Sequence, residues 1–170
     1  RVEPVGVATR ENVIDGATSS TLSIRLLGKF SLHVGDHEIE LLSRKTKALL
    51  GYLALTEAQE ESRERLIGLF WSEAPEERAR ASLRQALHEI RNGLQPTGFD
   101  GFHTDKLVVG LDRARIRVDL IDVLKDAAGG SPHSRLLQQQ DLIDDILGEV
   151  ESSDPAFQTW VLARRQTIRD

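Results

Sequence analysis

One stretch of the chain carries polar side chains at a helical spacing that suits nucleic-acid recognition. Residues 75–94 are predicted to form an amphipathic helix, because an apolar set recurs every three or four residues: Ala79, Leu83, Ala86, Leu87, Ile90 and Leu94. The opposite face would present hydrogen-bond donors for base edges and phosphates: Arg78, Ser82, Gln85, His88 and Asn92, flanked by Arg84 and Arg91. Taken alone, this face is better explained as an ordinary solvated surface. The neighbouring elements reverse that preference.

Three residues set the expected bounds of this helix. Pro75 suits the first helical position, where its missing N–H would have no acceptor in any case. Gly93 is expected to end the helix, and Pro96 would prevent it from restarting.

The segment before this helix begins with a predicted sheet. Residues 22–34 alternate apolar and polar side chains, which indicates half-buried strands with Gly28 as a bulge or kink. Gly35 and Asp36 favour a hairpin turn, and residues 37–41 are expected to return as a further strand.

Two shorter helices are predicted between this sheet and residue 75. Ser43 is a good N-cap for a helix over residues 44–55, and Ser62 caps a helix that ends near Trp71. A polar loop is expected between them. Only Ser72 to Ala74 then separate the second helix from the long one, a spacing typical of a helix-turn-helix.

A β-hairpin is predicted after the long helix, over residues 102–111, with Thr104, Asp105 and Lys106 at its tip. Residues 115–118 are expected to form a further short strand. Strands, three helices and a hairpin in this order predict an α+β fold: a winged helix-turn-helix with an N-terminal β-hairpin sheet.

These segments resemble the Streptomyces antibiotic regulatory protein family, which joins an OmpR-like winged helix to a bacterial transcriptional activator domain. The likeness is carried by L-L-G-K-F-S-L-H-V-G-D-H-E-I-E-L, S-R-K-T-K-A-L-L-G-Y-L-A-L, S-R-E-R-L-I-G-L-F-W and E-R-A-R-A-S-L-R-Q-A-L-H-E-I-R, and it spans most of residues 22–94. Further on, R-V-D-L-I-D-V and S-D-P-A-F-Q-T-W-V-L-A-R-R are similar to the start of the activator domain. At the wing, Lys106 and Leu107 replace the Gly-Tyr pair common in the family.

The resemblance implies sequence-specific binding of double-stranded DNA, activation of transcription through RNA polymerase, and homodimers on direct repeats. It also implies that the C-terminal part begins an all-α helical-repeat (TPR-like) segment. Apolar periodicity independently predicts helices there, over residues 119–128, 135–147 and 155–170. The expected organisation is a flexible lead-in (1–21), a winged-helix domain (22–118) and a truncated helical activator domain (119–170).

The last predicted helix carries an apolar stripe that must be covered: Phe157, Trp160, Val161 and Ile168. Exposing side chains of this size forgoes roughly 1.5–3 kcal/mol for each. We expect the stripe either to pack back on the winged helix or to pair with another copy of the chain.

Charge and composition narrow the function classes. The net charge of −5 divides into −1 for residues 1–21, +1 for 22–118 and −5 for 119–170, so DNA binding would need positive charges gathered on one face. The chain has no cysteine and no apolar run long enough to span a bilayer. It begins at Arg1 and contains no methionine, so we expect a fragment of an intracellular, cytoplasmic protein.

No enzyme, cofactor or metal site is expected. The nucleotide-binding, hydrolase and zinc-protease motifs are missing from the sequence. His33 and His37 are four residues apart, but they flank a predicted turn and have no third ligand nearby.

The leading hypothesis is a transcription regulator that places residues 75–94 in the major groove. Bases would be contacted by Arg78, Ser82, Gln85, His88 and Asn92, and phosphates by Lys45, Lys47, Arg84, Arg91 and Lys106. The alternative is a winged helix that serves protein–protein contact in a larger signalling protein. The near-neutral charge of residues 22–118 somewhat favours that alternative.

Overall fold

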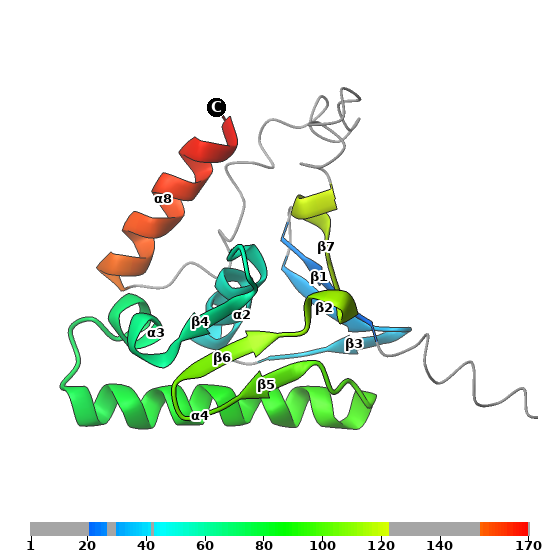
Figure 1. Cartoon of the computed structure of the whole chain (residues 1–170), viewed down its shortest axis with the longest axis horizontal. Helices are drawn as coiled ribbons and strands as arrows, with labels where there is room; N and C mark the ends of the chain where they lie inside the picture. Colours follow the sequence, from blue (N-terminus) through cyan, green and yellow to red (C-terminus); the bar gives the residue numbers. More distant parts are fainter. Residues whose placement is uncertain (1–20, 27–29, 42, 123–153, 170) are drawn as a thin grey trace, which may run out of the picture.

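The structure is a computed structural model that describes residues 21–26, 30–41, 43–122 and 154–169. It contains a four-stranded sheet, three central helices, a three-stranded wing and a C-terminal helix (Figure 1). The lead-in predicted for residues 1–21 lies almost wholly outside the described residues, as does Gly28.

The predicted N-terminal strands are present: β1 (Leu22–Arg25), β2 (Ser31–Val34) and β3 (His37–Ile39) pair antiparallel in succession. Gly35 occupies the left-handed region at φ 59°, as the tight turn between β2 and β3 requires. The late strand β7 (Ile116–Val118) pairs parallel with β1, which gives the order β3-β2-β1-β7. Leu22 and Ile24 are buried while Ser23 and Arg25 are exposed, as alternation along a half-buried strand predicts.

Both predicted N-caps are confirmed. The Ser43 side chain accepts from the N–H of Thr46 at the start of α2 (Arg44–Leu55). The Ser62 side chain accepts from the N–H of Arg65 at the start of α3 (Arg63–Phe70). Each bond satisfies one of the first amides of its helix, which have no partner within the helix.

The long helix α4 (Glu76–Leu94) agrees with the predicted range of residues 75–94 to within one residue, and its end at Leu94 is confirmed, but the parts played by Pro75 and Gly93 differ from the prediction. Pro75 has an extended backbone (ψ 146°) and occupies the N-cap position, and the first residue with helical geometry is Glu76. Gly93 lies within the helix, where a Cβ would come 3.1 Å from Cδ2 of Leu41, so the glycine serves close packing. The chain continues into a 3-10 turn, η1 (Gln95–Thr97), because Pro96 is tolerated in a first turn. Gly98, with φ 75°, then ends the helical path.

The wing consists of β5 (Phe102–Thr104) and β6 (Val108–Leu111), as predicted, and of a third strand that was not. The segment expected to be a polar loop contains β4 (Glu60–Ser62), which pairs antiparallel with β6. An edge strand is held by backbone hydrogen bonds and needs no apolar alternation, so a Glu-Glu-Ser sequence can form one. The sheet order is β4-β6-β5.

The last predicted helix is present as α8 (Pro155–Arg169), and it packs on α3. Phe157 and Val161 are buried, the Phe157 ring lies 4.6 Å from that of Phe70, and Trp160 lies 4.8 Å from Tyr52. Of the two ways of covering this stripe, the structure therefore shows packing against the winged helix. Ile168 has no described side chain.

The remaining C-terminal expectations are mostly beyond the described part of the chain. Residues 119–122 are helical, in agreement with a helix beginning at Asp119, and the predicted helix over residues 135–147 lies outside the described residues. The repeat character of residues 119–170 therefore stays a prediction. Among the helices that the structure describes, none is both long enough and apolar enough to cross a membrane.

Candidate nucleic-acid interface

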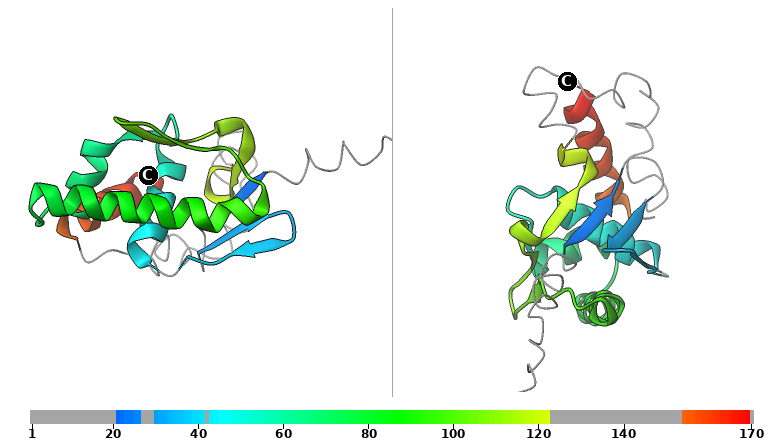
Figure 2. Two further views of the ribbon diagram at one scale, coloured as in Figure 1. Left: turned by 90° about the horizontal axis from the view of Figure 1, so that it is seen from below. Right: turned by 90° about the vertical axis from the view of Figure 1, so that its right-hand side faces the viewer.

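The predicted division of α4 into two faces is confirmed. Its buried residues are those of the expected apolar stripe: Ala79, Leu83, Ala86, Leu87, Ile90 and Leu94. The opposite side is termed the donor face; its members are Arg78, Ser82, Arg84, Gln85, His88, Arg91 and Asn92, all exposed except for the partly exposed Ser82. Seen from below, α4 crosses the front of the molecule with the wing along one side (Figure 2).

Two contacts organise the C-terminal half of the donor face. Asn92 Nδ2 lies 3.1 Å from His88 Nε2, so the amide and the imidazole are held together one turn apart. Arg91 Nη2 donates to Oγ1 of Thr104 on β5 at 2.6 Å. A guanidinium has further N–H groups, so Arg91 can bind a phosphate while it joins the helix to the wing.

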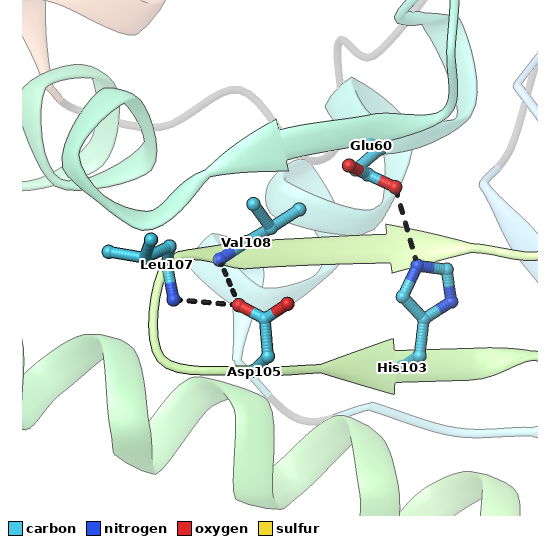
Figure 3. A network of polar contacts seen from close by, with 5 residues as sticks. All are labelled: Glu60, His103, Asp105, Leu107 and Val108. Carbon is cyan, nitrogen blue, oxygen red and sulfur yellow. Dashed lines mark hydrogen bonds and ion pairs between the residues drawn. The ribbon is translucent and has the colours of Figure 1, made fainter.

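The tip of the wing is a turn built on Asp105. Its Oδ1 accepts the N–H groups of Leu107 at 2.7 Å and Val108 at 2.8 Å (Figure 3), which lower the pKa of the Asp105 carboxyl. The turn leaves Lys106 exposed and Leu107 74% exposed. The predicted tip is therefore shifted by one residue, from Thr104–Lys106 to Asp105–Leu107, because Thr104 still belongs to β5.

Arg63, at the start of α3, fixes the wing tip to the helices. This role was not predicted from the sequence. Its Nε donates to the Asp105 carbonyl at 2.6 Å, and its backbone N–H donates to the Leu107 carbonyl at 2.8 Å. The wing tip, α3 and the first half of α4 enclose a groove that Arg80, Arg84 and Lys106 help to line. Arg84 and Lys106 were predicted; Arg80, which pairs with Glu76, was not.

A second missed residue, Glu89, joins α2 to α4. Its Oε1 accepts the N–H of Ser43 at 3.1 Å and its Oε2 accepts the hydroxyl of Thr46 at 2.8 Å. A carboxylate there also suits the positive end of α2. The available signal was the position of Glu89 directly before Ile90 of the buried stripe, where an acidic group needs polar partners.

The structure does not bring all predicted phosphate contacts together. Lys45 Nζ lies 5.1 Å from the ring centroid of Trp71, the residue that follows α3. This cation–π contact holds the Lys45 side chain beside the connector between α3 and α4. Lys45 and Lys47 are both half-buried, and neither belongs to the groove beside the wing tip. Arg84 and Lys106, by contrast, line that groove together.

The three wing strands are bridged by a side-chain pair across Gly110. Register places Glu60 of β4 and His103 of β5 on either side of Gly110 in β6. His103 Nε2 reaches over the glycine to Oε2 of Glu60 at 3.6 Å (Figure 3). A Cβ on Gly110 would lie 2.5 Å from His103 Nε2, so a side chain here would push the His103 ring from its present position.

The two histidines considered as metal ligands lie on paired strands, where His37 is opposite Val34 and His33 opposite Glu38. Within the described ranges, no group of three His, Cys, Asp or Glu residues is placed to hold a metal ion.

Comparison with known proteins shows what the chain is similar to. No family model matches. Over 91 residues, 54% of this chain, it is 25% identical to the transcriptional regulatory protein MoaR1 of Mycobacterium bovis and of Mycobacterium tuberculosis. The chain resembles transcriptional regulators. It matches 29% of the length of these relatives, so it corresponds to only part of such a protein.

The fold has a match among solved structures. Mycobacterium tuberculosis EmbR, solved in complex with a low-affinity phosphopeptide, superposes with a TM-score of 0.56 at 20% identity, over 87% of this chain and 41% of EmbR. This likeness supports the mixed α+β fold with a β-sheet N-terminal region.

Proposed function

We propose that this chain is the DNA-binding part of a transcriptional regulator, with α4 placed in the major groove of double-stranded DNA. The observation that carries the proposal is the hydrogen bond between Arg91 and Thr104, which makes the donor face of α4 and the wing one surface. A helix with one buried apolar stripe and one exposed face of amide, guanidinium and imidazole groups fits this groove.

The side chains divide between two tasks. Bases are contacted by Arg78, Ser82, Gln85, His88 and Asn92, and phosphates by Arg84, Arg91 and Lys106, with Lys45 and Lys47 further away. Gln85 is the strongest candidate for direct base contact, because it is exposed mid-helix and its amide can form a bidentate pair with adenine.

The finer features follow from the family resemblance and from the similarity to MoaR1. They are membership of the Streptomyces antibiotic regulatory protein family, activation of transcription with RNA polymerase as a partner, homodimers on direct repeats and a cytoplasmic location. A division into a winged helix (22–118) and a helical activator segment (119–170) belongs to the same proposal. No catalytic activity or cofactor is part of it.

A protein-binding winged helix is the second candidate, and the charge around the start of α4 favours it. Three glutamates are exposed there: Glu73, Glu76 and Glu77. The Glu76 carboxylate forms an ion pair with Arg80, which partly neutralises that arginine. Carboxylates at this end oppose a close approach of phosphates. DNA affinity is therefore expected to depend on α4 from Arg84 onward, together with the wing, and to weaken steeply with salt.

Selection of bound fragments from a random pool of duplexes separates the two candidates. A DNA-binding protein enriches a motif, and the enrichment is lost in Gln85→Ala. Gln166→Ala is the matched control, because this glutamine is exposed on α8, on the other side of the molecule from α4 (Figure 1). A pool that stays random with correctly folded protein would rule out sequence-specific binding.

A further inference from the structure

A second hollow is lined by the end of α2, strand β7 and helix α8. Strand β7 and helix α8 lie on the other side of the molecule from α4 (Figure 1). This β7 hollow has apolar walls formed by Leu55, Ile116, Val118 and Ile121. Its remaining lining is polar, and two groups of that lining lack the partners that buried groups normally have.

The first of these groups is the side-chain carbonyl of Gln59, whose amide Nε2 donates to the Ala54 carbonyl at 3.4 Å. Gln59 is only 5% exposed, and its Oε1 is buried without a hydrogen-bond donor. Its backbone is fixed, because its N–H donates to Thr56 and its carbonyl accepts from Leu111. A buried amide oxygen without a donor costs free energy, so the position favours a bound molecule that brings an N–H or O–H.

The second group is the guanidinium of Arg164 on α8, whose Nε is buried without an acceptor. Arg113 and Arg117 lie at the same hollow, and none of the three arginines has an ion pair in the part of the chain that the structure describes. Arg115, between them in sequence, is paired with Asp100.

The charges at the hollow sum to an excess of one positive charge, since the three arginines are accompanied by Glu57 and Asp122. Unpaired guanidinium groups present planar N–H pairs that match the two oxygens of a carboxylate or phosphate. The arginines of the lining can thus donate hydrogen bonds to an anionic group, and Gln59 Oε1 can accept one from an N–H or O–H group.

We propose that the β7 hollow binds a small organic anion with an apolar body and a hydroxyl or amino group. Arg164, with Arg113 and Arg117, binds the carboxylate or phosphate head. Gln59 Oε1 accepts the ligand N–H or O–H, and the apolar walls cover the body. Because α8 forms one side and β7 and α2 form the other, the bound molecule joins the C-terminal helix to the winged helix. This site is independent of DNA binding.

Calorimetric titration of the whole chain with four probes tests the site. Phenyllactate carries a carboxylate, a hydroxyl and an aromatic body, and 3-phenylpropionate is the same molecule without the hydroxyl. Phenyl phosphate presents the other head group, and 2-phenylethanol has no anion. We expect saturable binding of phenyllactate or phenyl phosphate, the better one identifying the head group, and none of 2-phenylethanol. If phenyllactate binds, removing its hydroxyl should weaken binding up to about tenfold.

Variants then locate the binding. Arg164→Gln and Arg117→Gln should each weaken binding of the anion at least about tenfold, since a charged hydrogen bond is lost. Gln59→Met, which keeps the shape but removes the acceptor, should abolish the preference for the hydroxylated probe. Arg44→Gln is the control, because Arg44 is exposed at the start of α2, outside the hollow. The proposal is overturned if no anionic probe binds to folded protein, or if binding is unaffected in both arginine variants.

Discussion

The carboxylate of Asp154 holds Ser72 through both of that residue's hydrogen-bond donors. Its Oδ2 accepts the Ser72 N–H at 2.8 Å and its Oδ1 accepts the Ser72 hydroxyl at 2.8 Å. The same carboxylate accepts the N–H of Ala156 in the first turn of α8. One buried group therefore joins the start of α8 to the connector that leads into α4.

Replacing Asp154 should loosen this junction. We expect Asp154→Ala to lower the free energy of unfolding by about 1–3 kcal/mol, because the Ser72 amide and the first turn of α8 lose their acceptor. Urea unfolding, followed by the fluorescence of Trp71 and Trp160, measures the change. Asp154→Asn keeps one acceptor and should lose less; equal stability of Asp154→Ala and the unaltered chain would contradict the role.

Gln85→Ala should discriminate between specific and random DNA. We expect a loss of roughly 1–3 kcal/mol on the selected site and much less on random sequence, because only the selected site offers the base edge. Fluorescence anisotropy with labelled duplexes measures both. An equal loss on both duplexes, with folding intact, would show that Gln85 does not contact a base.

Arg84→Gln and Lys106→Gln should each flatten the dependence of log affinity on log salt by about one ion, since each removes one phosphate contact. Lys45→Gln should change the slope less, because Lys45 lies over Trp71 rather than at the groove beside the wing. Titrations on one duplex at several salt concentrations give the slopes, with Arg25→Gln as a control on the exposed side of β1. Unchanged slopes in both Arg84→Gln and Lys106→Gln would show that DNA does not bind at the groove between α4 and the wing tip.

Tyr52, the only tyrosine of the chain, should ionise late. Burial, followed by its hydrogen bond to Glu61 at 2.7 Å, raises the Tyr52 pKa from 10.0 to about 12. A raised pKa in the folded state means that the stabilisation is complete below pH 10 and is lost as the pH rises towards 12. Tyrosinate absorbance against pH measures the midpoint directly. Glu61→Gln should lower it, and a midpoint near 10 in folded protein would show that the phenol is solvated.

Gly110→Ala should displace the His103 ring from Glu60. The new methyl group would lie 2.5 Å from His103 Nε2, and the half-exposed imidazole can turn towards solvent, so the cost should be at most about 1 kcal/mol, the value of an exposed ion pair. Thermal unfolding gives the stability, and the double variant Gly110→Ala with His103→Ala is the control, because it has no ring to displace. A loss well above this value in the single variant would show that the His103 ring cannot move aside.

The elements with local signals were predictable from the sequence. Ser43 and Ser62 mark helix starts by their own hydroxyl groups, and the stripe from Ala79 to Leu94 defines the buried face of α4 by its period alone. The role of Gly93 was missed, because its packing depends on Leu41, which is far away in sequence.

The connections between elements were not predictable. β4 is a strand only because β6 lies beside it, and its Glu-Glu-Ser sequence has no strand period of its own. Likewise, Arg63 joins the wing tip and Glu89 joins the start of α2 through contacts between residues more than forty positions apart. The donor face of α4 could be inferred residue by residue, whereas its attachment to the wing through Arg91 and Thr104 required the structure.

The parallel pairing of β1 with β7 has a consequence for the order of folding. β1 is an inner strand, yet one of its neighbours, Ile116 to Val118, is synthesised only after all three central helices and the wing. Until then the backbone of Leu22 to Ile24 has an open edge, and such an edge can pair with another chain. Closing the sheet also requires a contact between distant residues, which slows folding. A nascent or shortened chain that ends before Ile116 should therefore aggregate through β1, even though every residue of the proposed DNA-binding surface has already been made.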